Sequence, residues 1–158
     1  PEISDETARY MAYVNSRSRL RAVTLYAIWN EKNAIVAGTW NKVEDYGIWF
    51  FTKYWDWAVD ISPIWNLYKS EVYEMARFLW VNDEILKARP TDWLHPNWAT
   101  DEDQIGCSYD ELEWAMVQYD EWKRSNNFDW REKEVMEIYS KRHEVNAHKM
   151  VMPKVFEI

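Results

Sequence analysis

Apolar residues recur at helical spacing in three stretches of the chain. They return every three or four positions after Ser16, again from Tyr68, and again from Ser108. The positions are Leu20, Val23, Thr24, Ala27 and Ile28; then Tyr68, Val72, Met75, Ala76 and Leu79; then Tyr109, Leu112, Met116 and Tyr119. We expect three helices, and we expect the apolar stripe of the second to lie in the core.

Local capping patterns place further helix boundaries. Ser108 and Glu111 have the spacing of a capping box, which predicts the start of the third helix. Asp129 is placed to cap a last helix, from about residue 130 to 147. Another helix is expected to begin within 41–46, with its N-terminus toward any anionic ligand.

One short run, residues 34–37, is wholly apolar and stops at Gly38 and Thr39. This pattern predicts a buried β-strand followed by a turn of small residues. Open α/β sheets bind their ligands at the carboxyl ends of such strands. We therefore expect an α/β fold in which this chain is mostly helical, with one clear strand.

Side chains suited to a nucleotide follow that turn. They are Thr39, Glu44, Lys53, Asp60 and Lys69. Lysines neutralise phosphates and carboxylates hold Mg²⁺, so the set fits a nucleotide with its metal ion. On spacing alone, a solvated loop rich in charge remains the simpler interpretation.

Composition narrows the class of protein. The chain has 158 residues, the length of one domain, with 47% hydrophobic and 29% charged residues. No apolar run approaches the ~20 residues that span a bilayer, and no signal peptide is visible, so we expect no membrane partner. The net charge of −8 argues against a nucleic-acid partner, because phosphate contacts need a basic surface.

Cysteine and histidine give no sign of a metal or a nucleophile. Cys107 is the single cysteine, which excludes an internal disulfide and suits a cytoplasmic protein. We expect it to be a small buried residue. His143 and His148 are five positions apart, which does not place both on one helical face, so a metal role is not expected.

Three blocks of sequence carry a family resemblance. They are GTWNKVEDYGIWFFTKYWDWAVDISPIWNLYKSEVYE, PTDWLHPNWATDEDQIGCSYDELEWAM and IYSKRHEVNAHKM followed by PKVFEI. In this order they resemble the NAD synthetases, and the match runs from about Asn15 through nearly the whole chain. Ordered blocks of this length are far more specific than one short motif. The resemblance implies a Rossmann-like adenine-nucleotide-binding fold of the N-type ATP pyrophosphatase kind, in one domain.

The resemblance also implies residue roles. It assigns Thr39, Lys69 and Thr91 to ATP, Glu44 to Mg²⁺, and Arg19, Lys53, Asp60, His148 and Lys149 to deamido-NAD. Without it, Arg19 and the neighbouring Arg17 and Arg21 would form a solvated basic face. The acidic run 101–103 would be a solvated loop or helix start, with at most a supporting role beside the site.

The chemistry implied by the resemblance is amide formation. ATP would activate the nicotinate carboxylate of deamido-NAD as an acyl-adenylate, and ammonia would then attack. The family's SGGxDS phosphate loop does not occur here, so the chain is expected to be a C-terminal portion that is inactive alone. Homodimerisation is the family's habit. Whether ammonia is free or comes from glutamine is left open.

Tryptophan stands at most positions where the family has glycine. The chain has 12 Trp and 3 Gly, against a usual glycine content of about 7%. The positions are Trp40, Trp49, Trp55, Trp57, Trp65, Trp80, Trp93 and Trp98, and also Trp29 and Trp130. Our hypothesis is that UGA codons for glycine are written as Trp. The alternatives are a deliberately altered, inactive fold variant and a protein-binding module with an aromatic surface.

Overall fold

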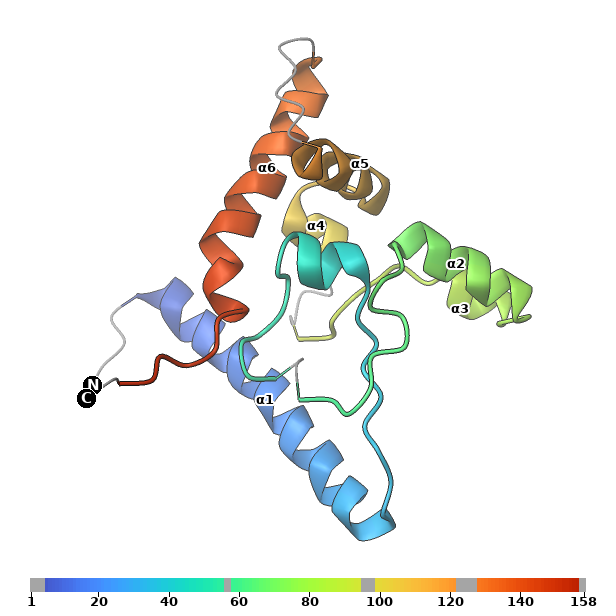
Figure 1. The fold of residues 1–158 in the computed structure, drawn as a ribbon, viewed down its shortest axis with the longest axis vertical. Coiled ribbons are helices and arrows are strands. Elements are labelled where there is room, and N and C mark those ends of the chain that lie inside the picture. Colours follow the sequence, from blue (N-terminus) through green and yellow to red (C-terminus); the bar gives the residue numbers. More distant parts are fainter. Residues whose placement is uncertain (1–4, 56–57, 95–98, 122–127, 157–158) are drawn as a thin grey trace.

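The structure is a computed structural model that describes residues 5–55, 58–94, 99–121 and 128–156. It is mostly helical (Figure 1). In chain order the elements are α1 (Glu6–Lys32), the π-helical turn η1 (Lys42–Gly47), α2 (Lys69–Phe78), α3 (Asp83–Lys87), α4 (Asp101–Ile105), α5 (Tyr109–Asp120), α6 (Trp130–Asn146) and the 3-10 turn η2 (Ala147–Lys149). Among the described residues, no helix is long and apolar enough to cross a membrane.

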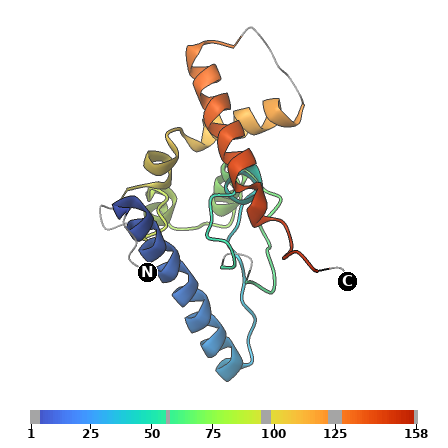
Figure 2. The ribbon, with the colours of Figure 1, turned by 90° about the vertical axis from the view of Figure 1, so that its left-hand side faces the viewer.

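The core lies where η1, α4, α5 and α6 meet. Helices α5 and α6 pack together, and η1 lies against α5 (Figures 1 and 2). The buried side chains are Val43, Ile48, Ile105, Cys107, Tyr109, Leu112, Ala115, Met116, Val135 and Tyr139. Cys107 is 4% exposed, as predicted, and burial raises the pKa of its thiol to about 11. The thiol is therefore protonated at neutral pH.

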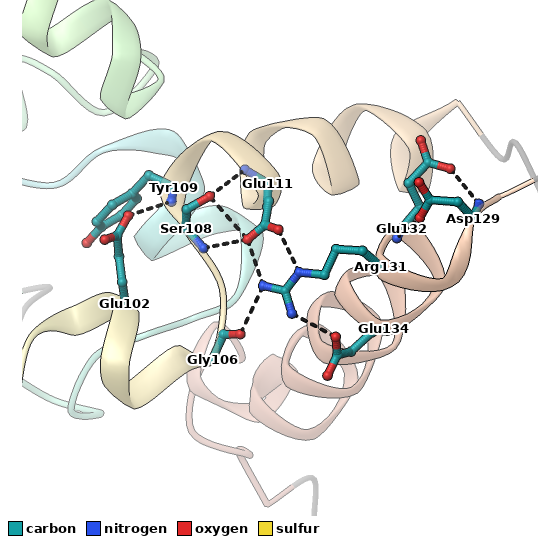
Figure 3. Close-up of polar contacts among 9 residues, drawn as sticks. All are labelled: Glu102, Gly106, Ser108, Tyr109, Glu111, Asp129, Arg131, Glu132 and Glu134. Carbon is teal, nitrogen blue, oxygen red and sulfur yellow. Dashed lines mark hydrogen bonds and ion pairs between the residues drawn. The ribbon is translucent and has the colours of Figure 1, made fainter.

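Two of the predicted helix starts are confirmed (Figure 3). Ser108 and Glu111 form a capping box at α5, and Asp129 forms a second one at α6. Arg131 joins the two helices, because its guanidinium donates to Glu111 at 2.7 and 2.8 Å. The same group donates to Glu134 at 2.7 Å and to the carbonyl of residue 106 at 3.3 Å. These contacts fix the α5–α6 angle over the core.

The predicted strand at 34–37 is wrong in extent. The described residues contain no named strand, and this run makes one isolated parallel bridge, between Ala37 and Ile61. The pairing consists of Gly38 N–H to the Ile61 carbonyl at 2.7 Å and Asp60 N–H to the Val36 carbonyl at 2.8 Å. A strand needs continuous neighbours on its edges, and here only residues 60–61 supply them.

Two predictions about helices need correction. Helix α1 begins at Glu6, capped by Asp5, ten residues before the expected start at Ser16. Its buried residues are small or short: Val14, Ser18 and Ala22. The expected apolar stripe points away, and Leu20 is 64% exposed. The spacing of apolar residues predicted the helix, but it did not predict which face of the helix packs against the rest of the chain.

Helix α2 has the predicted bounds but not the predicted burial. It runs from Lys69 to Phe78 with Leu79 as its C-cap, yet none of its residues is buried. Met75 is 44% exposed and Leu79 is 62% exposed, so the stripe is not part of the core of this chain. The helix packs lightly on α3 and α5 at one flank of the molecule (Figure 1).

Candidate functional site

A cavity of about 920 Å³ opens between α1, η1, the segment after η1, α4 and the end of α6. It collects eight of the nine predicted site residues. These are Arg19, Thr39, Glu44, Lys53, Lys69, Thr91, His148 and Lys149. The sequence therefore identified side chains that the fold gathers into one place.

Asp60 is the exception. It does not line the cavity, and its carboxylate accepts a hydrogen bond from the backbone N–H of Val36 at 2.7 Å. The side chain therefore fastens the 60–61 segment beside the 34–37 run.

The π-helical turn η1 presents Glu44 to the cavity. Asn41 caps the turn, and its side-chain oxygen accepts from the N–H groups of Val43 and Glu44, both at 3.1 Å. Asp45 also lines the cavity, is 5% exposed, and accepts from the Asn41 N–H at 3.0 Å. The Asp45 carboxylate therefore binds backbone of its own turn, whereas the Glu44 carboxylate binds side chains of other elements.

Glu44 sits between a lysine and a tyrosine. Lys69, at the first position of α2, forms an ion pair with it at 2.8 Å. Burial alone would lower the pKa of Lys69, but the charge and hydrogen bond of Glu44 outweigh it and raise that pKa. Tyr109, at the start of α5, donates its hydroxyl to the same carboxylate. The ammonium of Lys69 is therefore fully charged at neutral pH.

Asp101 completes this group, although we expected at most a supporting role for the acidic run 101–103. It is 8% exposed, and one carboxyl oxygen lies 3.1 Å from the Tyr109 hydroxyl. The other oxygen is buried without a hydrogen-bond partner. Burial and the negative charge of Glu44 raise the pKa of Asp101 to about 6. Because the hydroxyl has one proton, it can donate to only one of the two carboxylates.

A second cationic group surrounds the segment after η1. Arg19 donates to the Lys53 carbonyl at 3.3 and 3.2 Å. The Lys53 ammonium donates to the His148 carbonyl at 2.6 Å, and Lys149 donates to the carbonyls of Trp49 and Phe51 at 2.7 and 2.6 Å. Four of the residues predicted to bind the dinucleotide therefore line the same cavity, and Arg19 and Lys53 also bind the backbone carbonyls of Lys53 and His148.

Arg17 and Arg21 bind backbone carbonyls of the loop that carries Thr91, although Arg21 remains exposed to solvent as in the alternative of a solvated face. Arg17 donates to the Leu94 carbonyl at 2.8 Å, and Arg21 donates to the Asp92 carbonyl at 2.8 Å. Both arginines thereby hold the loop that carries Thr91 against α1. Thr91 in turn donates to the Ala99 carbonyl at 3.3 Å. The loop is fastened at both ends beside the cavity.

Of the four carboxylates that line the cavity, Glu44 and Asp101 lie together and could hold a cation. No cluster of three or more His, Cys, Asp or Glu side chains suited to a metal occurs in the described parts of the chain. Mg²⁺ is usually bound by one or two carboxylates, with phosphates and waters completing its shell. Glu44 and Asp101 share one hydroxyl and line the same cavity, and Asp101 has an unpartnered buried oxygen. The residues present therefore fit this ion.

Three tryptophans also line the cavity: Trp40, Trp49 and Trp55. Trp40 is 6% exposed and stacks on Trp65, with ring centroids 5.4 Å apart. Trp49 adopts φ of +53°, a left-handed conformation that favours glycine. Its indole nitrogen is buried without a hydrogen-bond partner.

Comparison with known proteins identifies the family to which the chain belongs. The NAD synthase family profile matches residues 2–153. An NH(3)-dependent NAD(+) synthetase of Picrophilus torridus is 40% identical over 142 residues, covering 89% of this chain and 53% of that protein. One of Alkaliphilus metalliredigens is 36% identical over 152 residues, covering 96% and 57%. The chain spans about half the length of the curated relatives it matches.

Two solved structures, one named an NMN synthetase and one an NAD synthetase, are similar to this chain. An NMN synthetase from Francisella tularensis superposes with a TM-score of 0.77 at 31% identity, covering 94% of this chain and 58% of that one. An NH3-dependent NAD synthetase from Campylobacter jejuni, in complex with nitrate, has a TM-score of 0.65 at 26% identity, covering 90% and 54%. The chain belongs to the NAD synthase family.

Proposed function

We propose that this chain supplies part of the active site of an NAD synthetase, which amidates deamido-NAD with ammonia at the expense of ATP. One observation carries the proposal: a single cavity brings together a lysine with carboxylates suited to a metal ion and a separate cationic cluster. Lys69 stands with Glu44 and Asp101 in the first group, and Arg19, Lys53 and Lys149 form the second. Two anionic substrates meeting in one site need such an arrangement.

The two groups have different roles in this proposal. Lys69, Thr39 and Thr91 bind ATP and neutralise phosphate charge as pyrophosphate leaves. Arg19, Lys53, His148 and Lys149 bind deamido-NAD and bring its nicotinate carboxylate to the α-phosphate. Adenylation of that carboxylate needs no protein nucleophile, so alignment of the reactants is the main task of these residues.

Mg²⁺ is the metal that we propose for the site. Glu44 would hold it, with the Asp101 carboxylate beside it. The ion supplies charge neutralisation for the phosphates of ATP. Ammonia is the proposed nitrogen donor, since the relatives' names specify NH(3) dependence.

The wider architecture is also part of the proposal. A Rossmann-like α/β sheet of the N-type ATP pyrophosphatase kind would form when the 34–37 run pairs with strands outside this sequence. A glycine-rich phosphate loop would come from the same missing part, so the chain alone is expected to be inactive. Homodimerisation and a cytoplasmic location complete the proposal and stay predictions.

The test is turnover by the chain reassembled with the segment that precedes it in its relatives. NAD formation is measured with ATP, Mg²⁺, deamido-NAD and ammonium chloride. We expect turnover that Lys69→Ala reduces by about a hundredfold, while Lys87→Ala, an exposed lysine paired with Asp83, has no effect. Equal rates in these two variants would contradict the proposed roles. Replacing ammonium by glutamine tests the nitrogen source.

A mononucleotide is the second candidate substrate. The structural neighbour with a TM-score of 0.77 is named an NMN synthetase, whereas the sequence relatives are named NAD synthetases. Both reactions amidate a nicotinate carboxylate and would use the same ATP residues. The same assay with nicotinic acid mononucleotide in place of deamido-NAD separates them by the ratio of kcat/KM values.

A further inference from the structure

The backbone from residue 47 to 53 runs along the cavity, and side chains from two helices bind its carbonyls. His143 and Asn146 of α6 contact the carbonyls of residues 47 and 48, at 2.5 and 3.3 Å. Lys149 of η2 contacts the next carbonyls, at residues 49 and 51. Arg19 of α1 contacts the last one. A loop held this closely by its carbonyls has few alternative conformations.

The ring of His143 is held in place for this contact. A carbonyl oxygen only accepts hydrogen bonds, so the Nδ1 of His143 carries the proton. The ring stacks on Tyr139 with centroids 5.9 Å apart and lies 5.1 Å from the ring of Tyr119. Tyr139 itself is fully buried. The contact therefore ties the loop to the most rigid part of the core.

The held conformation is one that the loop would not adopt freely. Trp49 has φ of +53°, a left-handed conformation that is strained for a residue with a side chain. Glycine at this position would remove the strain but would populate several alternative conformations, so it too would need contacts that select this one. Such conformations persist only where surrounding contacts impose them. His143 and Lys149 supply these contacts on both sides: the imidazole lies 5.5 Å from the indole, and the ammonium binds the Trp49 carbonyl.

Lys53, four residues after Trp49, lines the cavity. We infer that His143 and Asn146 are positioning residues for dinucleotide binding: they fix the backbone of residues 47–53, and this sets where the Lys53 ammonium stands. The inference rests on the proposed function, in which Lys53 binds deamido-NAD. It gives the end of α6 a role that neither residue's position in the sequence suggested.

The inference predicts a selective effect on one substrate. In the reassembled enzyme, His143→Ala combined with Asn146→Ala should raise the KM for deamido-NAD about tenfold, because one or two hydrogen bonds to the loop are lost. The KM for ATP should stay within twofold, since Lys69 lies on α2 and Thr91 lies in the loop before α4. An enzyme that carries His143→Asn instead of His143→Ala should regain most of the lost affinity for deamido-NAD, because the asparagine amide nitrogen can take the place of Nδ1. Glu144→Ala, exposed on the same turn of α6, is the matched control.

A second measurement on the 158-residue chain does not depend on activity. Hydrogen exchange of the Ile48 and Phe50 amides, which bond to the carbonyls of Val43 and Glu44, should quicken about tenfold in the double variant. Amides of α5 should exchange as in the parent chain. Unchanged exchange at residues 48–50, or equal rises in both KM values, would overturn the inference. If the parent enzyme turns over no dinucleotide, the proposed function fails while the exchange result still decides whether the loop is held.

Discussion

The hydroxyl of Tyr109 donates a hydrogen bond to the carboxylate of Glu44, which lies 65 residues earlier in the chain. The same carboxylate is paired with Lys69, and the same hydroxyl reaches Asp101. One phenol thus connects α5 to Glu44 and Asp101, two of the carboxylates that line the cavity. Burial, followed by the charges of Glu44 and Asp101, raises the pKa of Tyr109, so the hydroxyl remains a donor at any physiological pH.

Replacement of Tyr109 by Phe should weaken the response to Mg²⁺. The ring would still fill its place in the core, but Glu44 would lose the donor that orients it. Loss of such a partner behind a metal ligand typically costs about tenfold or more in metal affinity. We expect the Mg²⁺ concentration for half-maximal activity of the reassembled enzyme to rise about tenfold.

The control for this prediction is Tyr26→Phe, on α1 and outside the cavity lining. A Tyr109→Phe enzyme that keeps its Mg²⁺ dependence but loses activity would show that the hydroxyl serves another step. Thermal unfolding of both variants reports whether either change alters the fold itself.

The local parts of this fold followed from sequence, and the distant contacts did not. Ser108, Glu111 and Asp129 were identifiable as caps because the partners of a capping box are three residues apart. The meeting of Tyr109 with Glu44, and of His143 with the carbonyl of Gly47, depends on how the helices pack. No local spacing encodes those contacts.

The burial of the apolar faces of α1 and α2 also depends on distant contacts, which the sequence pattern does not encode. Periodicity marked the apolar faces of α1 and α2 correctly, but Leu20 and Leu79 are exposed in this chain. An apolar face needs a partner surface, and the chain spans about half the length of its relatives. Eight of the nine predicted site residues line one cavity because the family resemblance supplied positions that composition could not. Asp60 shows the limit of that route, since its carboxylate binds backbone instead.

The ion pair between Glu111 and Arg131 should make stability depend on pH in the acid range. The hydrogen bond from Arg131 lowers the pKa of Glu111 to about 2, from an ordinary value of 4.5. A carboxyl with a lowered pKa stabilises the fold above its unfolded pKa, and this contribution is lost as pH falls from about 4.5 toward 2. Glu111→Gln keeps the capping box but removes the charge.

We expect Glu111→Gln to lower the free energy of unfolding by about 1 kcal/mol at pH 7, because solvent beside the pair weakens it. The difference from the parent chain should shrink to nothing near pH 2. Urea titrations at several pH values measure it. Glu132→Gln makes the same change in the capping box of α6, and an equal pH dependence there would argue against the Arg131 contact as the cause.

Replacement of Trp80 by Gly should stabilise the chain. Trp80 follows α2 with φ of +58° and is 93% exposed, so its ring gains little from packing. Glycine adopts this conformation without the steric cost that a side chain brings. We expect the free energy of unfolding to rise by about 1 kcal/mol. Trp130→Gly, at an exposed position with ordinary helical backbone, should instead lower it by about 0.5–1 kcal/mol.

The natively produced protein should carry glycine at position 49. Trp49, Trp80 and Trp93 all have φ between +53° and +58°, where the backbone favours glycine, and Trp49 also buries an unpartnered indole nitrogen. Peptide masses across residues 33–69, read beside the codons, measure the identity of this position. Glycine masses at UGA codons would indicate a recoded gene and remove the indole that lines the cavity beside Lys149. Tryptophan masses would contradict the hypothesis, and activity should then depend on Trp49→Gly and Trp40→Gly in the reassembled enzyme.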